Sequence, residues 1–264
     1  MARPIWRGAI SFGMVSIPVG IYTAVAEKDL HFHQIHDKCG SRIKLQKFCP
    51  VCDRTVMPEE LQRGYEVSKG AYVIVTEEDF ENVPVPSKHT ITVDRFVEAT
   101  EVGPVYYDSS YYLQPEETGR KPFALLMEAL KKKKVCALAK IALRNKESLC
   151  LLMLSGEGLL METLFFPDEI REQEALNLDN VKVEERELNM ALSLIDMLAG
   201  PFEPEEYQDE YRVALMERIE AKLQGKQITE QPSTPEPRVI DLFDALKASL
   251  EAAKTSKPSK RKSG

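Results

Sequence analysis

The chain has 264 residues, of which 43% are hydrophobic, and a formal net charge of −7. This length allows one large domain or two small ones with a substantial core. No apolar run approaches the roughly 18 residues that a membrane span needs. The first residues contain no apolar signal-peptide core, so we expect a cytoplasmic protein without a membrane partner.

Charge is unevenly distributed along the chain. Residues 1–165 contain 21 Lys or Arg and 21 Asp or Glu, residues 166–230 contain 7 and 17, and residues 231–264 contain 7 and 4. The acidity therefore belongs mainly to one segment, and the part before it can present a basic face. A negative net charge does not by itself exclude nucleic acid as a partner.

The first part of the chain predicts β-structure. Runs rich in β-branched and aromatic residues, with turn formers between them, occupy residues 71–76, 89–97, 104–113, 148–155 and 159–166. The sequence SGEG at 155–158 indicates a hairpin between the last two runs, because glycine adopts the positive φ of a tight turn. A helix is predicted over 121–132, where the apolar residues Phe123, Leu126, Met127 and Leu130 have helical spacing.

After Pro167 the pattern becomes helical. Apolar residues with helical spacing predict one helix over 188–198, which ends at Gly200-Pro201, and a second over 207–223. A Pro-rich linker is expected at 225–238, an amphipathic helix at 239–254 and a basic, disordered tail at 255–264. The apolar stripe of the last helix consists of Val239, Leu242, Phe243, Leu246 and Leu250.

One short segment concentrates positive charge. From Lys131 to Lys146 there are seven basic residues and no acidic one. The odd positions from 135 to 143 are apolar, which predicts a strand with one face in the core and basic residues on the other. Basic residues two apart would be about 6–7 Å from each other, close to the phosphate spacing of one nucleic-acid strand. The alternative is an ordinary solvated outer face.

The cysteines suggest a metal site. His36 and Cys39 form an H-x-x-C pair, and Cys49 and Cys52 form a C-x-x-C pair. Two such pairs can enclose one tetrahedral zinc ion, so we expect a zinc-ribbon-like insert at 36–54 with one structural zinc per subunit. The alternatives are a redox C-x-x-C pair and plain reduced thiols. The loop between the pairs carries a second basic cluster, and Cys136 and Cys150 are expected in the core.

No motif argues for catalysis. His31, His33 and His36 could be taken for the ligands of a metal-dependent hydrolase. No H-E-x-x-H, P-loop, G-x-S-x-G or carboxylate pair accompanies them. We therefore interpret His31 and His33 as ordinary strand residues and expect no catalytic residue.

Several long segments resemble the bacterial Ku proteins of non-homologous end joining. They are ARPIWRGAISFGMVSIPVGIYTA at the N-terminus, RGYEVSKGAYVIVTEEDFENV at 63–83, VDRFVEATEVGPVYYDSSYYLQP at 93–115 and LLMETLFFPDEIR at 159–171. The helix at 239–254 is similar to the terminal helix of that family. The resemblance covers nearly the whole chain.

The resemblance implies a mainly β fold with α-helices. It implies a central β-barrel with an extended bridge, a helical C-terminal part over 167–224 within a core of 1–224, and a homodimeric ring that threads onto a duplex end. It also implies DNA repair at double-strand breaks as a nucleoid-associated, non-enzymatic factor that recruits DNA ligase D. We place ligase docking on the apolar stripe of 239–254.

A ring needs positive charge only on its inner wall, so an acidic chain is compatible with DNA binding. The alternative function is a zinc-ribbon RNA-binding or transcription accessory protein. The candidate DNA-binding residues are Arg7, Arg42, Lys44, Lys47, Lys131, Lys132, Lys133, Lys134, Lys140, Arg144 and Lys146.

Overall fold

The computed structural model describes residues 3–83, 89–143, 146–173, 181–225 and 242–255. The chain divides into two compact units, Met1–Gln173 and Glu174–Gly264. This boundary lies within the 1–224 segment that the sequence suggested as one core. In the described parts of the chain, no helix is both long and apolar enough to cross a membrane.

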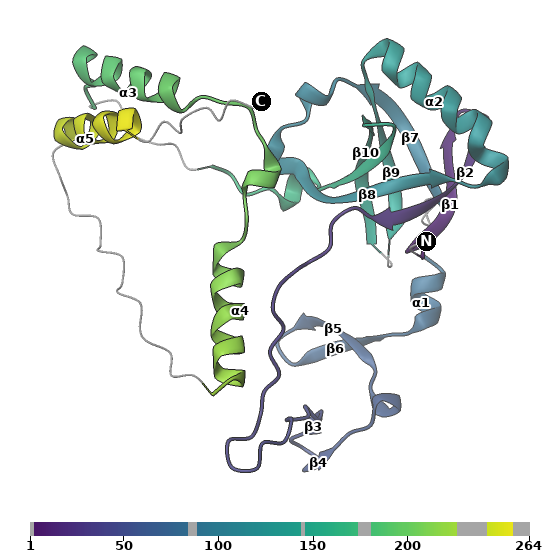
Figure 1. Cartoon of the computed structure of the whole chain (residues 1–264). Coiled ribbons are helices and arrows are strands. Elements are labelled where there is room, and N and C mark those ends of the chain that lie inside the picture. The colour runs from purple at the N-terminus through teal and green to yellow at the C-terminus, as the bar shows by residue number, and fades with distance from the viewer. Residues whose placement is uncertain (1–2, 84–88, 144–145, 174–180, 226–241, 256–264) are drawn as a thin grey trace. The chain divides into compact units, whose positions relative to one another are not determined.

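Seven strands of the first unit close into a barrel, which confirms the predicted β-barrel (Figure 1). β1 pairs with β7 in parallel, and the other neighbouring pairs are antiparallel. Closure leaves the barrel without an exposed sheet edge. In spatial order the strands are β1 (Trp6–Phe12), β2 (Val15–Thr23), β8 (Tyr107–Pro115), β11 (Gly158–Leu164), β10 (Lys146–Ser155), β9 (Cys136–Leu143) and β7 (Thr90–Val97).

Aliphatic side chains fill the barrel interior. In β9, Ala137, Ala139 and Ile141 are fully buried, while Lys140 is exposed. The predicted alternation is thus confirmed within β9, because successive strand side chains point to opposite faces. Other fully buried side chains are Ile10, Ile17, Val19, Ile21, Ile91, Leu151, Leu152 and Met161.

Helix α2 (Arg120–Lys133) packs on the barrel through the predicted apolar stripe. Phe123, Leu126 and Leu130 are buried in the same core as the strands. Removing each of these side chains from water contributes about 1.5–3 kcal/mol. The expected hairpin is also present, since Ser155 pairs with Gly158 across the β10–β11 turn and Gly156 has φ +57°.

The basic segment that contains Lys134 and Lys146 is not a single strand, so that prediction was wrong. Lys131–Lys133 form the last turn of α2, and Lys134 is its C-cap, with φ +57° and its N–H bonded to the carbonyl of Leu130. β9 begins only at Cys136, and Lys146 opens β10. The helix persists because its apolar stripe continues to Leu130, and because cations are favourable at a helix C-terminus.

Residues 24–89, called the extension below, leave the barrel after β2 and return at β7 (Figure 1). Of residues 31–70, all but Cys49 and Val56 are exposed. The described extension therefore has no hydrophobic core. Its elements are β3 (Phe48–Cys49), β4 (Arg54–Thr55), η1 (Pro58–Glu60), β5 (Arg63–Ser68), β6 (Ala71–Val75) and α1 (Glu77–Glu81). The other short 3-10 helices are η2 (Ala99–Glu101), η3 (Pro104–Tyr106), η4 (Glu117–Gly119), η5 (Pro167–Glu169) and η6 (Pro204–Glu206).

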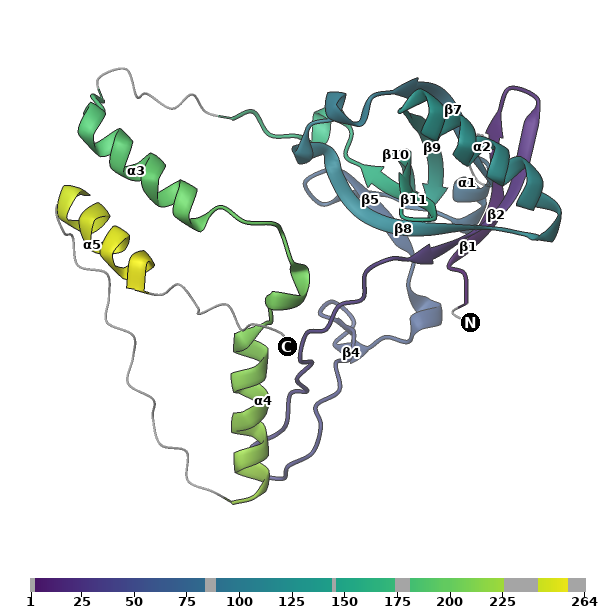
Figure 2. The same cartoon turned by 45° about the horizontal axis from the view of Figure 1, so that its top comes forward.

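The second unit contains α3 (Glu185–Leu198), α4 (Glu210–Leu223) and α5 (Leu242–Thr255), as the helical periodicity predicted. α3 and α5 lie side by side in both views (Figures 1 and 2). The guanidinium carbon of Arg186 is 4.3 Å from the ring centroid of Phe243, a cation–π contact between the two helices. Residues 226–241 and 256–264, which include all but the first residue of the predicted linker (225–238) and of the predicted tail (255–264), lie outside the described residues.

Candidate nucleic-acid interface

Three of the candidate DNA-binding cations on the barrel are paired with carboxylates. The pairs are Arg7–Glu116 at 3.5 Å, Lys140–Glu147 at 3.8 Å and Lys146–Glu169 at 2.7 Å. Glu147 follows the basic segment in sequence, and the β9–β10 hairpin brings it back toward Lys140. The run without acidic residues in the sequence is therefore not free of carboxylates in space.

The Lys146–Glu169 pair shifts the pKa of both of its members. The hydrogen bond from the Lys146 ammonium raises the pKa of that lysine and lowers the pKa of the Glu169 carboxyl. Both groups lie at the surface, where such pairs are weak and screened by salt. A phosphate approaching Lys146 must still compete with this carboxylate. Arg144 lies outside the described residues.

The lysines at the end of α2 form a second group, Lys131–Lys134, and all four are exposed. Within the described residues, none of them has a carboxylate within 4.0 Å. Successive residues of a helix point about 100° apart, so the four side chains fan around the axis. They can supply local positive potential, but they do not form the straight line that a strand would give.

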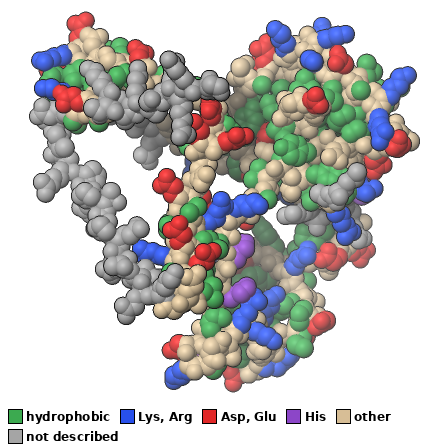
Figure 3. All heavy atoms as spheres, in the orientation of Figure 1, with side chains coloured by type: hydrophobic (Ala, Val, Ile, Leu, Met, Phe, Trp, Pro, Cys, Tyr) green, Lys and Arg blue, Asp and Glu red, His purple; other side chains and the backbone are tan. Residues whose placement is uncertain are grey.

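The extension carries the third group of candidates. Residues 30–47 contain four Lys or Arg, at 38, 42, 44 and 47, and one acidic residue, Asp37. Arg42, Lys44 and Lys47 are exposed, and no described carboxylate lies within ion-pair distance of them. Figure 3 shows blue basic side chains gathered beside the purple histidines. These three are therefore as free of carboxylates as Lys131–Lys134, and they share one loop of the extension, whereas Arg7, Lys140 and Lys146 are paired.

The four predicted zinc ligands form two pairs in this structure. Nδ1 of His36 is 3.0 Å from Sγ of Cys39, and the thiol of Cys52 is hydrogen-bonded to the sulfur of Cys49. No three His, Cys, Asp or Glu side chains among the described residues lie close enough together to hold a metal ion. The structure thus brings together His36 with Cys39 and Cys49 with Cys52, as two separate pairs.

Backbone and side-chain donors favour thiolate character in both pairs. Hydrogen bonds from Ser41 and His36 lower the pKa of Cys39 to about 7. The backbone N–H groups of Cys52 and Val51 lower the pKa of Cys49. By contrast, the core thiols are inert, since burial raises the pKa of Cys150 to about 12.

His31 and His33 are exposed and lie in irregular structure, so their interpretation as strand residues was wrong. The reason is that this part of the extension has no neighbouring strand or core to pair with. The described residues around them form no metal-binding group. The hydrolase alternative therefore gains no support from the geometry.

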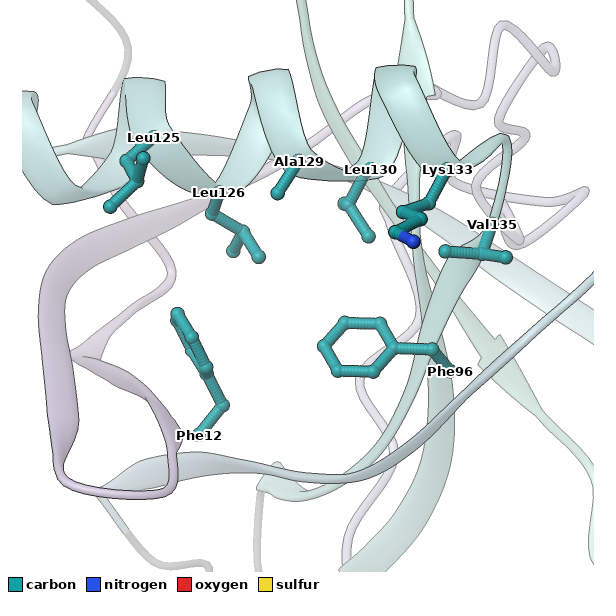
Figure 4. Close-up of a pocket in the computed structure, with 8 residues that line it drawn as sticks. All are labelled: Phe12, Phe96, Leu125, Leu126, Ala129, Leu130, Lys133 and Val135. Carbon is teal, nitrogen blue, oxygen red and sulfur yellow. The ribbon is translucent and has the colours of Figure 1, made fainter.

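Sequence reasoning missed an apolar hollow beside α2. It has a volume of about 580 Å³ and lies between α2, Phe12 and Phe96, with Lys133 and Val135 at one end (Figure 4). The side chain of Leu125 is 65% exposed next to buried Leu126, so the apolar face of α2 is wider than its core stripe. Such a lining does not suit phosphate, but it suits another apolar surface.

Comparisons with known proteins agree with this architecture. Residues 11–190 match the family described as the Ku70/Ku80 beta-barrel domain. Three similar curated proteins are each named "Non-homologous end joining protein Ku". The protein of Heliobacterium modesticaldum is 43% identical over 97% of this chain and 94% of its own length. Those of Symbiobacterium thermophilum and Archaeoglobus fulgidus are 42% and 40% identical, over 97% and 96% of this chain and 64% and 100% of their own lengths. The chain therefore belongs to the Ku family.

Proposed function

We propose that this chain binds the ends of double-stranded DNA without sequence preference, as a ring of two copies that acts in non-homologous end joining. One observation carries the proposal: the extension of a Ku-family barrel presents Arg42, Lys44 and Lys47 with no carboxylate beside them. The similar curated proteins are named for that pathway. The role is that of a binding factor and scaffold rather than an enzyme.

The chemistry of the cations fits a partner recognised through its backbone. Lys and Arg contact phosphate oxygens, and phosphate contacts position a protein on DNA without reading its sequence. Exposed cations without an acidic neighbour release counterions from DNA when they bind, which supplies salt-dependent affinity. A factor for arbitrary breaks needs this kind of contact.

Apolar surfaces support assembly into a dimer. The β5–β6 hairpin exposes Tyr65, Val67, Tyr72 and Val73 on its two faces, with 53–68% of each residue accessible. An isolated two-stranded hairpin is marginally stable in water and gains stability by packing on another surface. The apolar hollow beside α2 is a second surface of this kind (Figure 4). A second copy of the chain is the partner we assign to these surfaces.

The second unit is assigned to partner recruitment rather than DNA. Residues 174–264 contain 18 acidic and 13 basic residues, a net negative charge that does not favour phosphate. In α5, Phe243, Leu246 and Leu250 are half-buried. A helix that follows a Pro-rich tether and has an apolar stripe commonly docks in a partner groove, and we propose DNA ligase D as that partner. Docking must then use the α3–α5 pair or displace α5 from α3.

The test compares linear duplex with covalently closed circular DNA of matched mass in a gel shift, with linear ends free or blocked by bulky groups. Threading requires an end, so we expect binding to the free linear duplex and little binding to the circle or to the blocked duplex. Equal binding to circular DNA or to single strands would contradict end binding and favour the RNA-binding or transcription accessory alternative. A chain that binds ends as a monomer in light scattering would contradict the ring.

A further inference from the structure

Two loops of the extension have the same backbone design. In each, two donor residues are separated by two others, and the residue that follows adopts a positive φ. The first loop runs from His36 to Cys39 and is followed by Gly40 at φ +69°, and the second runs from Cys49 to Cys52 and is followed by Asp53 at φ +50°. Asp53 is a non-glycine residue at positive φ, a conformation that is uncommon but that Asp adopts more readily than most residues.

Within each turn, the two potential metal-ligand atoms lie next to each other. The N–H of Gly40 donates to the carbonyl of His36 at 2.8 Å, which closes the first turn, and Nδ1 of His36 lies 3.0 Å from the Cys39 sulfur. In the second turn, β3 and β4 pair Cys49 with Arg54, and the thiols of Cys49 and Cys52 contact each other.

Neighbouring groups support the two turns from outside. Oδ1 of Asp37 lies 3.8 Å from Nε2 of His36, on the ring nitrogen that faces away from Cys39. Arg54 makes two hydrogen bonds to the carboxylate of Glu60, at 3.1 and 2.5 Å. A carboxylate on the second ring nitrogen is a common support for a histidine that ligates a metal through its first.

These turns have no buried core behind them among residues 31–70. Only Cys49 and Val56 are less than exposed among residues 31–70, while Leu45 and Val51 are more than 90% exposed. Strands of two residues and a single Ile35–Arg42 bridge cannot stabilise a fold of this size without a core. Small units of this kind are commonly stabilised by a metal ion.

We propose that the two turns close on one structural Zn²⁺ held by Nδ1 of His36 and the sulfurs of Cys39, Cys49 and Cys52. One imidazole and three thiolates form a closed tetrahedral set that suits zinc and leaves no position for a reacting water. No three of these donors lie close enough to hold an ion in this structure, and the nine residues between Cys39 and Cys49 would allow the two turns to move together on one. Three protons leave the thiols as the three Zn–S bonds form.

This site would act on the cations of the proposed function. Arg42, Lys44 and Lys47 all lie in the loop between the two turns. Closing both ends of that loop limits its conformations, so the three side chains lose less entropy when they bind phosphate. This effect on phosphate binding rests on the proposed function. The zinc site itself does not, because zinc binding is measured without DNA.

The experiment measures zinc in the full-length protein purified without chelators. We expect about one ion per chain. Cys39→Ser and Cys49→Ser should each lower the zinc content at least tenfold. Cys136→Ala is the matched control, because that buried thiol belongs to the barrel, and it should keep the metal. Both Ser variants should also be cleaved faster by trypsin at Lys44 and Lys47.

A second measurement does not depend on any variant. Protein reconstituted with Co²⁺ should show thiolate-to-cobalt charge-transfer absorption and the visible bands of a tetrahedral ion. Wild-type protein without zinc, or with a Cys49–Cys52 disulfide in place of metal, would overturn the proposal. Zinc retained in Cys39→Ser would overturn the assigned ligand set. Failure of end binding with zinc present would overturn the proposed function alone.

Discussion

The barrel and the extension are continuous in sequence but opposite in physical character. The barrel buries most of its aliphatic residues, and its basic residues Arg7, Lys140 and Lys146 face carboxylates. The extension exposes nearly every residue from 31 to 70, and its basic residues Arg42, Lys44 and Lys47 have no described acidic neighbour. One region therefore supplies stability, and the other supplies the surface that we assign to DNA.

The difference teaches that a count of cations along a sequence is a poor guide to a phosphate-binding surface. The segment from Lys131 to Lys146 has seven basic residues and no acidic one, yet folding places Glu147 and Glu169 beside two of its lysines. What matters is the charge that remains unneutralised after folding.

The largest effect is expected for stability. Ile141→Ala in β9 creates a cavity in the barrel, so it should lower the free energy of unfolding by about 2–5 kcal/mol. Leu45→Ala in the extension, where the side chain is 93% exposed, should change it by less than about 0.5 kcal/mol. Urea denaturation followed by circular dichroism measures both. Equal losses would show that the extension contributes to the core.

The second effect concerns the C-terminal unit. If DNA contacts belong to the extension, truncation at Gln231 should leave duplex-end binding nearly intact while it abolishes stimulation of DNA ligase D. A matched protein that ends at Lys254 keeps α5 and should still stimulate ligation. End-to-end ligation of an un-nicked linear duplex by the purified ligase measures the stimulation by each of the two proteins. Stimulation that survives truncation at Gln231 would place ligase docking on the first unit.

The smallest effect concerns the neutralised lysine of the barrel. Lys146→Gln should lower the urea midpoint slightly at about pH 7 and by less at about pH 3. The sign follows from Glu169: its folded pKa lies below its ordinary value of 4.5, so the pair stabilises above that value and the contribution is lost as pH falls through the folded pKa. At the alkaline end the contribution is lost as pH rises through the raised pKa of Lys146. A constant difference between the two proteins at both pH values would show that the pair is not formed.

Much of the barrel could be predicted from the sequence, because burial imposes a period. Alternation identified the inward residues of β9, and helical spacing identified Phe123, Leu126 and Leu130 of α2. The end of α2 was predicted to within one residue, at 132 where the helix ends at Lys133, but the pattern did not separate the cap at Lys134 from the strand that follows. The pairing of Lys140 with Glu147 and of Lys146 with Glu169 could not be predicted either, because it depends on how the strands fold together rather than on the pattern of neighbouring residues.

The extension was harder to predict, because it has no core to impose a period. His31 and His33 were interpreted as strand residues only because no catalytic motif accompanies them, and the described structure places them in irregular backbone. The two cysteine-containing turns were recognisable from spacing, which depends only on neighbouring residues. Packing of α5 on α3 could not be inferred, because an amphipathic stripe does not specify its partner.

The central claim is that phosphate contacts come from the extension rather than from the paired lysines of the barrel. The measurement is the salt dependence of duplex-end affinity for two full-length variants. The extension variant combines Arg42→Gln, Lys44→Gln and Lys47→Gln. The barrel variant combines Lys140→Gln and Lys146→Gln. Each phosphate contact contributes roughly 0.9 to the slope of log K against log salt, so the triple variant should reduce that slope by up to about 2.7. The barrel variant should leave the slope close to the wild-type value. A reduced slope in the barrel variant with an unchanged slope in the extension variant would contradict the claim.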